Sequence, residues 1–167
     1  AGLALENNKV FVYAMAPFLA LRSIEQAKCG AGLMDLPICM LSVGIGLGYA
    51  DAGPTHYTTE DFACFRSVIG TSIYTPADVN STKLIAREML DKPKFSYIRL
   101  DREVLPSVEP KIDNNDYLKG FKIFGEDPKN KIVIISHGKM LHKCLEIYKS
   151  DTSKFLCVDI FRSKPFP

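Results

Sequence analysis

The chain has 167 residues, of which 47% are hydrophobic and 24% charged, a composition typical of a folded globular protein. Its 21 Lys and Arg against 19 Asp and Glu give a net charge of +2, which argues against a nucleic-acid binder or an anionic-membrane binder. No apolar run reaches the roughly 18 residues that cross a bilayer. From the charge and the lack of such a run, we expect neither nucleic acid nor a membrane as partner.

The first elements alternate between strand and helix. Positions 1–6 resemble the end of a helix, which leads us to expect a section of a longer polypeptide. Val10–Met15 then predicts a strand, and Pro17 suits the first turn of the helix that follows. The nearly continuous apolar run Pro37–Val43 predicts a strand covered on both faces.

The alternation continues to about residue 100. Thr71–Tyr74 predicts a short strand, and Thr75 is expected to cap a helix over 76–90, with Asp78 at the capping-box position. Phe95–Leu100 predicts the next strand. Strands that alternate with helices in this way indicate crossover units, so the fold class is α/β, a parallel sheet with helices on both faces.

A second, smaller unit follows. The proline-containing polar stretch 106–116 predicts an interdomain linker. Beyond it, Lys131–Ser136 predicts a strand, Lys139–Lys149 an amphipathic helix and Phe155–Phe161 another strand. This is one crossover unit of a second α/β domain, and it is too small to hold a full core alone.

The five cysteines predict neither a disulfide framework nor a zinc site, because their number is odd and no pair has CxxC spacing. Cys39 and Cys157 lie in apolar strand-like runs. We therefore expect buried free thiols and a cytoplasmic protein, since the cytoplasm is reducing.

A glycine-rich segment over 44–56 follows the second predicted strand, at the sheet edge where open α/β sheets bind ligands. It does not match the dinucleotide fingerprint, because Gly48 comes two residues after Gly46 rather than three. His56 has two interpretations: a residue that hydrogen-bonds the backbone beside a helix, or a proton donor or oxyanion partner at the sheet edge.

Two arginines lie at the end of the strand 95–100, again where ligands collect. The guanidinium of Arg99 or Arg102 is suited to bind a phosphate through two hydrogen bonds. Arg102 is equally suited to pair with Asp101 or Glu103, so the residues alone leave both interpretations open.

Five short motifs occur in order over roughly the first hundred residues: Pro17–Gln26, Gly53–His56, Glu60–Ser67, Tyr74–Asp78 and Tyr97–Arg102. Together they resemble the C-terminal half of a transketolase-like, thiamine-diphosphate-dependent enzyme. The resemblance implies that residues 1–108 are a pyrimidine-binding domain lacking its N-terminal part. Residues 109–167, down to the Lys164-Pro165 pair, resemble an incomplete transketolase C-terminal domain of three-layer α/β type.

The resemblance implies roles in binding thiamine diphosphate. Taken alone, Phe18 and Arg22 are typical of a core aromatic with a solvated neighbour four residues along a helix. In this family, Phe18 matches the aromatic that stacks on the aminopyrimidine ring, and Met15 matches a position that often holds a second aromatic. Leu21 and Arg22 are expected to line the same pocket.

The resemblance also implies substrate contacts. His56 matches the catalytic histidine that faces the substrate, and Arg102 matches the arginine that binds the sugar phosphate. A second family histidine aligns with Gly44, and the family's acidic residue aligns with Ala52, which leaves Asp51 one place earlier as the substrate-binding carboxylate. Both departures fall in the donor-sugar pocket, so the usual pentose phosphates are not the expected substrates.

The implied activity is transfer of a two-carbon ketol unit between sugar phosphates. The alternatives are a 1-deoxyxylulose-5-phosphate-synthase-like condensation and a non-catalytic assembly module of the same fold. An unrelated nucleotide-binding domain would need a phosphate loop, which the sequence lacks.

The resemblance further implies that the chain works with a partner. The family's essential glutamate lies just before the stretch that matches 1–4, and no Gly-Asp-Gly motif is present to hold Mg²⁺ and the diphosphate. We therefore expect a diphosphate-binding domain or an N-terminal transketolase subunit as partner, in a homodimer or heterotetramer. We also expect no turnover by these 167 residues alone.

Overall fold

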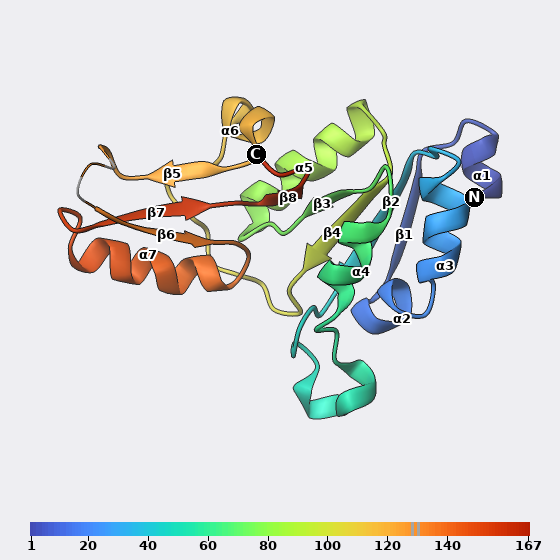
Figure 1. The fold of residues 1–167 in the computed structure, drawn as a ribbon, viewed down its shortest axis with the longest axis horizontal. Helices are drawn as coiled ribbons and strands as arrows, with labels where there is room; N and C mark the ends of the chain where they lie inside the picture. The colour runs from blue at the N-terminus through green and yellow to red at the C-terminus, as the bar shows by residue number, and fades with distance from the viewer. Residues whose placement is uncertain (128, 130) are drawn as a thin grey trace.

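The computed structural model describes residues 1–127, 129 and 131–167 and contains two sheets (Figure 1). Its helices and strands up to residue 100 are α1 (Gly2–Leu5), β1 (Val10–Met15), α2 (Ala16–Ala20), α3 (Ile24–Gln26), the π-helical turn η1 (Ala27–Gly32), β2 (Ile38–Val43), the 3-10 turns η2 (Ala50–Ala52) and η3 (Pro54–His56), α4 (Asp61–Ser67), β3 (Ser72–Tyr74), α5 (Val79–Asp91) and β4 (Ser96–Leu100). The remaining elements are α6 (Asn114–Lys119), β5 (Lys122–Phe124), β6 (Ile132–Ser136), α7 (Met140–Ser150), β7 (Phe155–Asp159) and β8 (Arg162–Lys164).

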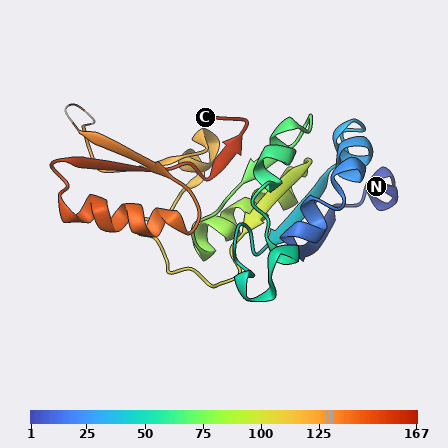
Figure 2. The same cartoon turned by 60° about the horizontal axis from the view of Figure 1, so that its bottom comes forward.

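The larger sheet has the strand order β1-β2-β4-β3-β8. Its first four strands run parallel, and β8 is antiparallel to β3. Leu19 and Phe65, from α2 and α4, pack on one face, whereas Ile85 and Met89 of α5 pack on the other. Figures 1 and 2 show α4 and α5 on opposite sides of the sheet. The predicted α/β class with a parallel sheet is confirmed.

The start of α5 differs from the prediction. The N-cap is Asp78, whose carboxylate accepts a hydrogen bond from the Ser81 backbone N–H at 2.8 Å, while the Ser81 hydroxyl accepts from the Asp78 N–H at 3.1 Å. Thr75 therefore precedes the helix and continues from strand β3, its N–H bonded to the Phe161 carbonyl. An aspartate closes this reciprocal cap as well as a threonine does, so the cap lies three residues later than predicted.

The helical pattern after Pro17 forms three short pieces rather than one helix. The Ser23 hydroxyl donates back to the Leu19 carbonyl at the end of α2, a bond that competes with helix continuation. The π-helical turn η1 then ends at Gly32, where an added Cβ would lie 2.7 Å from the Ile69 carbonyl oxygen. The close approach to this neighbouring loop explains why a glycine occupies that position.

The linker prediction is wrong at its C-terminal end. The acidic stretch begins α6, because Asp113 caps the helix by accepting from the Asp116 N–H at 2.9 Å. The Tyr117 hydroxyl of α6 lies 3.2 Å from that of Tyr74, so the segment packs against the larger sheet instead of spacing two domains.

The smaller sheet has the order β5-β7-β6, and β6 and β7 are parallel as predicted. Leu141 and Leu145 of α7 pack on one of its faces together with Cys157. β7 ends at Asp159, earlier than predicted, because the chain then leaves this sheet and joins the larger one as β8. The segments on either side of the smaller sheet thus both contact the larger sheet: α6 through Tyr117, and β8 through its pairing with β3.

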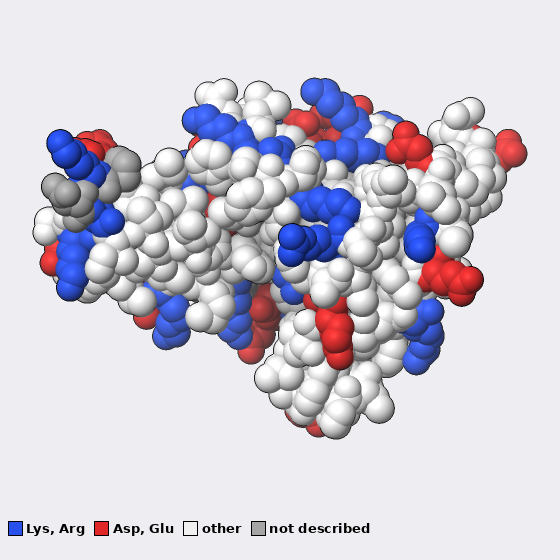
Figure 3. All heavy atoms as spheres, viewed as in Figure 1, with Lys and Arg blue, Asp and Glu red and all other residues white. Residues whose placement is uncertain are grey.

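The predicted burial of two thiols is confirmed, since Cys39 and Cys157 are 4% and 0% exposed. All five cysteines are free, and burial raises the pKa of Cys39 to about 12. On the face in Figure 3, Lys and Arg are scattered among Asp, Glu and uncharged residues. Among the described residues, no helix is long and apolar enough to cross a membrane.

Candidate functional site

The candidate site lies at the carboxyl edge of the larger sheet, at the bottom of Figure 1. β1 ends at Met15 and continues directly into α2, while β2 ends at Val43 and continues into the loop 44–60. An antiparallel bridge between Gly46 and Thr58 closes this loop. Two adjacent parallel strands thus deliver α2 and the loop to the same edge, where α/β sheets bind ligands.

Phe18 and His56 meet between these two segments. Their ring centroids are 5.2 Å apart at an interplanar angle of 72°, an edge-to-face contact. The His56 Nδ1 lies 3.0 Å from the Thr55 hydroxyl oxygen, and the Arg22 guanidinium lies 4.6 Å from the centre of the Phe18 ring. Three residues to which the resemblance assigned roles are therefore neighbours, although the phenylalanine and the histidine belong to different segments of the sequence.

Two clefts adjoin Phe18. One, of about 660 Å³, has α2 and the residues after it on one side and the loop on the other; its lining residues are Pro17, Phe18, Leu21, Arg22, Pro54, Thr55, Tyr57, Thr59 and Glu60. The second, of about 690 Å³, is mostly apolar and runs from Phe18 past Val12 and Met40. Leu21 and Arg22 thus share a cleft with Phe18. Met15 ends β1 opposite Val43 and is not among the residues that line either cleft.

The two predicted substrate-binding residues bind each other. Arg102 Nη1 donates to Asp51 Oδ1 at 2.5 Å and to the Gly48 carbonyl at 3.4 Å. Its guanidinium also lies 4.6 Å from the centre of the Tyr49 ring. The hydrogen bond from Arg102 lowers the pKa of the Asp51 carboxyl. Neither sequence neighbour that was considered as a partner of Arg102 takes this place: Glu103 pairs with Lys139 at 2.6 Å, and Asp101 Oδ1 accepts from the Glu103 N–H at 3.2 Å.

Sequence reasoning missed Tyr49, which fills the position that the family's second histidine would need. Gly44 has φ +75°, and a Cβ built there would lie 2.1 Å from Tyr49 Cε2. The Tyr49 ring centre is 6.3 Å from that of His56 and 4.6 Å from the Arg102 guanidinium, so Tyr49 neighbours both residues. The sequence did hold one signal for Tyr49: a glycine, Gly44, replaces the family's histidine, and the space of a lost side chain is open to another side chain.

Arg99 is a structural residue, and the suggestion that it binds a ligand phosphate is wrong. Its Nε and Nη2 donate to the two carboxylate oxygens of Asp61 at 2.8 and 3.1 Å. The Tyr97 hydroxyl lies 2.9 Å from both Asp61 Oδ2 and Ser42 Oγ; because a carboxylate only accepts, Tyr97 donates to Asp61 and accepts from Ser42. This buried network fixes the start of α4, and with it the end of the loop 44–60.

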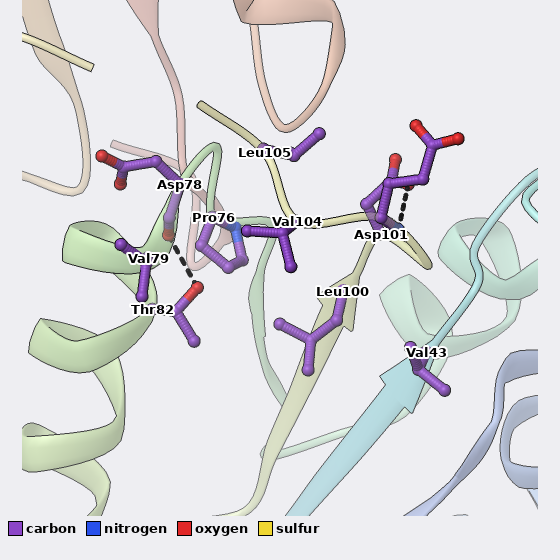
Figure 4. Close-up of a pocket in the computed structure, with 10 residues that line it drawn as sticks. Val43, Pro76, Asp78, Val79, Thr82, Leu100, Asp101, Val104 and Leu105 are labelled. Atoms are coloured by element: carbon purple, nitrogen blue, oxygen red, sulfur yellow. Dashed lines mark hydrogen bonds between the residues drawn. The ribbon is translucent and has the colours of Figure 1, made fainter. Parts of the chain in front are cut away.

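A further pocket at the same edge lies on the α5 side (Figure 4). Its volume is about 210 Å³, and apolar residues such as Val43, Leu100 and Val104 form much of its wall. The Asp78 carboxylate is already used as the helix cap and as an acceptor from the Val108 N–H. In the part of the chain that the structure describes, no group of three or more His, Cys, Asp or Glu is arranged to hold a metal ion.

A parallel α/β sheet with a ligand-sized cleft at its carboxyl edge defines the class of α/β ligand-binding domains. Residues 1–108 match the family model of the transketolase pyrimidine binding domain. The chain therefore belongs to the transketolase family, as the ordered motifs predicted. Membership of this family implies thiamine diphosphate as the cofactor.

Three comparisons illustrate this relationship. The chain is 33% identical over 117 residues to a subunit of apulose-4-phosphate transketolase from Phocaeicola vulgatus, covering 70% of the chain and 36% of that protein. It is 28% identical to 1-deoxy-D-xylulose-5-phosphate synthase of Malacoplasma penetrans, covering 85% of the chain and 23% of that protein. Its fold matches a split-gene transketolase, solved as an inactive β4 tetramer, with a TM-score of 0.80 at 23% identity; the match covers 98% of the chain and 53% of that structure. The chain thus spans about half or less of the length of these relatives.

Proposed function

We propose that this chain supplies the pyrimidine-binding half of the active site of a transketolase-like enzyme that transfers a two-carbon ketol unit between sugar phosphates. The observation that carries the proposal is the contact between Phe18 and His56 beside an open cleft at the carboxyl edge of the sheet. An aromatic wall and a titratable imidazole are the two kinds of group that this half of the site requires: one to hold a planar ring, the other to move a proton.

The residues around Phe18 fit the cofactor's ring. Phe18 lines both clefts, so a planar aminopyrimidine has space to stack beside it. Leu21 adds an apolar wall, and Arg22 covers one side of the phenyl ring. When bound, thiamine diphosphate supplies the nucleophilic carbon that attacks a ketose or 2-oxo-acid carbonyl. Met15 remains a more distant candidate for the same pocket.

His56 has the position for acid–base work on the substrate. It is half-buried, its ring packs against that of Phe18, and the Thr55 hydroxyl lies within hydrogen-bond distance of its Nδ1. Orientation of one ring nitrogen leaves the other directed elsewhere, which suits an imidazole that donates a proton to a substrate oxygen or removes one. The Arg102 guanidinium lies beside Tyr49, 4.6 Å from its ring centre, and is suited to bind the phosphate end of the sugar.

A second domain or subunit completes the site in this proposal and holds Mg²⁺ and the diphosphate. The similarity to a protein that is itself one subunit of a transketolase supports a divided enzyme, and so does the similarity to a split-gene transketolase whose β4 tetramer is inactive. We therefore propose that this chain alone does not turn over and that it acts in a homodimer or heterotetramer. The division into residues 1–108 and 109–167 and a cytoplasmic location are part of the same proposal.

The similarity to the apulose-4-phosphate transketolase of Phocaeicola vulgatus favours a phosphorylated ketose as donor. The similarity to a deoxyxylulose-phosphate synthase keeps a condensation with a 2-oxo-acid donor as the second candidate. Release of carbon dioxide from the donor distinguishes the two reactions, because ketol transfer releases none.

The proposal is tested by calorimetry on the assembled enzyme with thiamine diphosphate and Mg²⁺. We expect saturable binding that Phe18→Ala weakens about tenfold or more through the lost ring contact. The matched control is Phe11→Ala, since Phe11 lies in β1 on the α5 side of the sheet. A complex without saturable heat would instead identify a non-catalytic assembly module, and equal effects of the two variants would contradict the role of Phe18.

His56 requires a separate measurement. We expect His56→Gln to bind thiamine diphosphate as the unaltered enzyme does but to lower kcat about 100-fold or more, the usual contribution of a general acid or base. A variant with full kcat would remove His56 from the reaction while leaving the Phe18 site intact.

A further inference from the structure

We propose that Asp51 is a specificity-determining residue that occupies Arg102 and is displaced by a phosphate dianion. This inference rests on the proposed function, in which Arg102 receives the phosphate of the sugar. It changes the role that the sequence predicted for Asp51: the carboxylate competes with the substrate for the arginine and does not hold the sugar itself.

The first observation is that Arg102 is engaged. Its Nη1 binds the Asp51 carboxylate and the Gly48 carbonyl, and its flat face covers Tyr49. All three partners belong to the loop 44–60, so Arg102 connects this loop to the end of β4. A phosphate that binds Arg102 through two hydrogen bonds must take the place of at least the Asp51 carboxylate.

The second observation is that the ion pair is exposed. The side chains of Arg102 and Asp51 are 42% and 67% exposed. Water and salt screen such a pair, so its net stabilisation is small and an incoming anion can replace it. A sugar phosphate carries a charge of about −1.5 to −2 at pH 7, compared with −1 for the Asp51 carboxylate. The exchange therefore favours a phosphate and gives no advantage to a carboxylate ligand.

The third observation is the connection to His56. Tyr49 neighbours both residues: its ring centre lies 4.6 Å from the Arg102 guanidinium and 6.3 Å from the centre of the imidazole. Departure of Asp51 releases one of the contacts that hold this part of the loop. Phosphate binding is therefore expected to change the positions of the Tyr49 and His56 rings.

Glu103 offers a matched control, since it is a second exposed carboxylate beside Arg102. Its carboxylate binds Lys139 Nζ at 2.6 Å and makes no hydrogen bond to Arg102. Replacing Glu103 with Gln removes the same charge from the neighbourhood without freeing the guanidinium. The contrast between Asp51→Asn and Glu103→Gln thus separates direct competition from a general change in charge.

The experiment titrates the complete protein with inorganic phosphate at pH 7.5 and follows the backbone amide signals of the loop 44–60 by NMR. We expect Asp51→Asn to bind phosphate about 2- to 5-fold more tightly, the range expected for loss of an exposed ion pair. Glu103→Gln is expected to change the affinity less than about 1.5-fold by the same screening, and Arg102→Gln to abolish binding. Acetate, as a monoanion, is expected to bind the unaltered protein more weakly than phosphate.

Several results would overturn the inference: unchanged or weaker phosphate binding by Asp51→Asn, equal tightening by Glu103→Gln, or no binding by Asp51→Asn at all. None of them concerns the proposed cofactor site, because the titration contains no thiamine diphosphate and neither Arg102 nor Asp51 is among the residues that line the clefts beside Phe18. Circular dichroism of each variant verifies that the fold is retained.

Discussion

Arg99 and Arg102 are three residues apart in sequence, and each binds an aspartate, yet the two pairs have different surroundings. Arg99 and Asp61 are 10% and 0% exposed and make two hydrogen bonds, whereas the Arg102–Asp51 pair lies in solvent. A buried pair cannot exchange partners without leaving a charge in the interior, but an exposed pair can. The Arg99–Asp61 pair therefore stabilises the structure around the site, and the Arg102–Asp51 pair remains available to a ligand.

The largest effect is expected from breaking the buried pair. Asp61→Asn leaves the Arg99 charge buried without a counterion, so we expect the free energy of unfolding to fall by about 3–5 kcal/mol. Urea denaturation measures this change, with Asp51→Asn as the exposed counterpart. Equal, small losses for the two variants would show that the comparison between the pairs is wrong.

A third aspartate, Asp159 at the end of β7, is buried like Asp61 but has no hydrogen-bond partner for its Oδ1 within residues 1–127, 129 and 131–167. Burial raises its pKa to about 8. Because the unfolded chain ionises near pH 4 and the folded chain does not, this residue's contribution to stability is complete below about pH 4 and declines up to about pH 8.

Between the two pKa values each pH unit costs about 1.4 kcal/mol. We therefore expect the unaltered protein to lose up to about 4 kcal/mol between about pH 5 and pH 8, and Asp159→Asn to remove this decline. Thermal unfolding of both proteins at several pH values measures it. The assignment would be contradicted if the melting temperatures of the two proteins changed with pH in the same way. It would also be contradicted if the unaltered protein gained stability relative to Asp159→Asn as the pH rises.

A smaller effect is expected at Gly44, where the loop leaves β2. An alanine there would adopt φ +75° and collide with the Tyr49 ring, so we expect Gly44→Ala to reduce stability by about 1–3 kcal/mol. The double variant Gly44→Ala with Tyr49→Ala should recover part of this loss, because the collision is removed and only the backbone strain remains. If the two losses simply add, Tyr49 does not occupy the space that the structure assigns to it.

Most strands and the two long helices could be predicted because their signals are local. Runs such as Ile38–Val43 and Phe155–Asp159 are apolar for most of their length, and α7 carries a regular apolar stripe. The polar stretch that begins α6 was misinterpreted because Asp is favoured both in linkers and at helix N-caps. β8 was missed since its pairing with β3 joins residues about 90 positions apart.

The same limit applies to the site. The ordered motifs identified Phe18 and His56, and the structure brings them together. The partners of the two arginines were not predictable, because Asp61 and Asp51 are 38 and 51 residues from the residues they bind. Local charge patterns offered Asp101 and Glu103 instead, and only the three-dimensional path of the loop 44–60 excludes them.

The most direct measurement of the central claim is a structure of the assembled enzyme with thiamine diphosphate and Mg²⁺. We predict that the aminopyrimidine ring lies beside Phe18, with a centroid separation of about 4.5–7 Å, and that the His56 ring faces the substrate space. A cofactor ring bound elsewhere, with the cleft between Phe18 and the loop empty, would contradict this prediction.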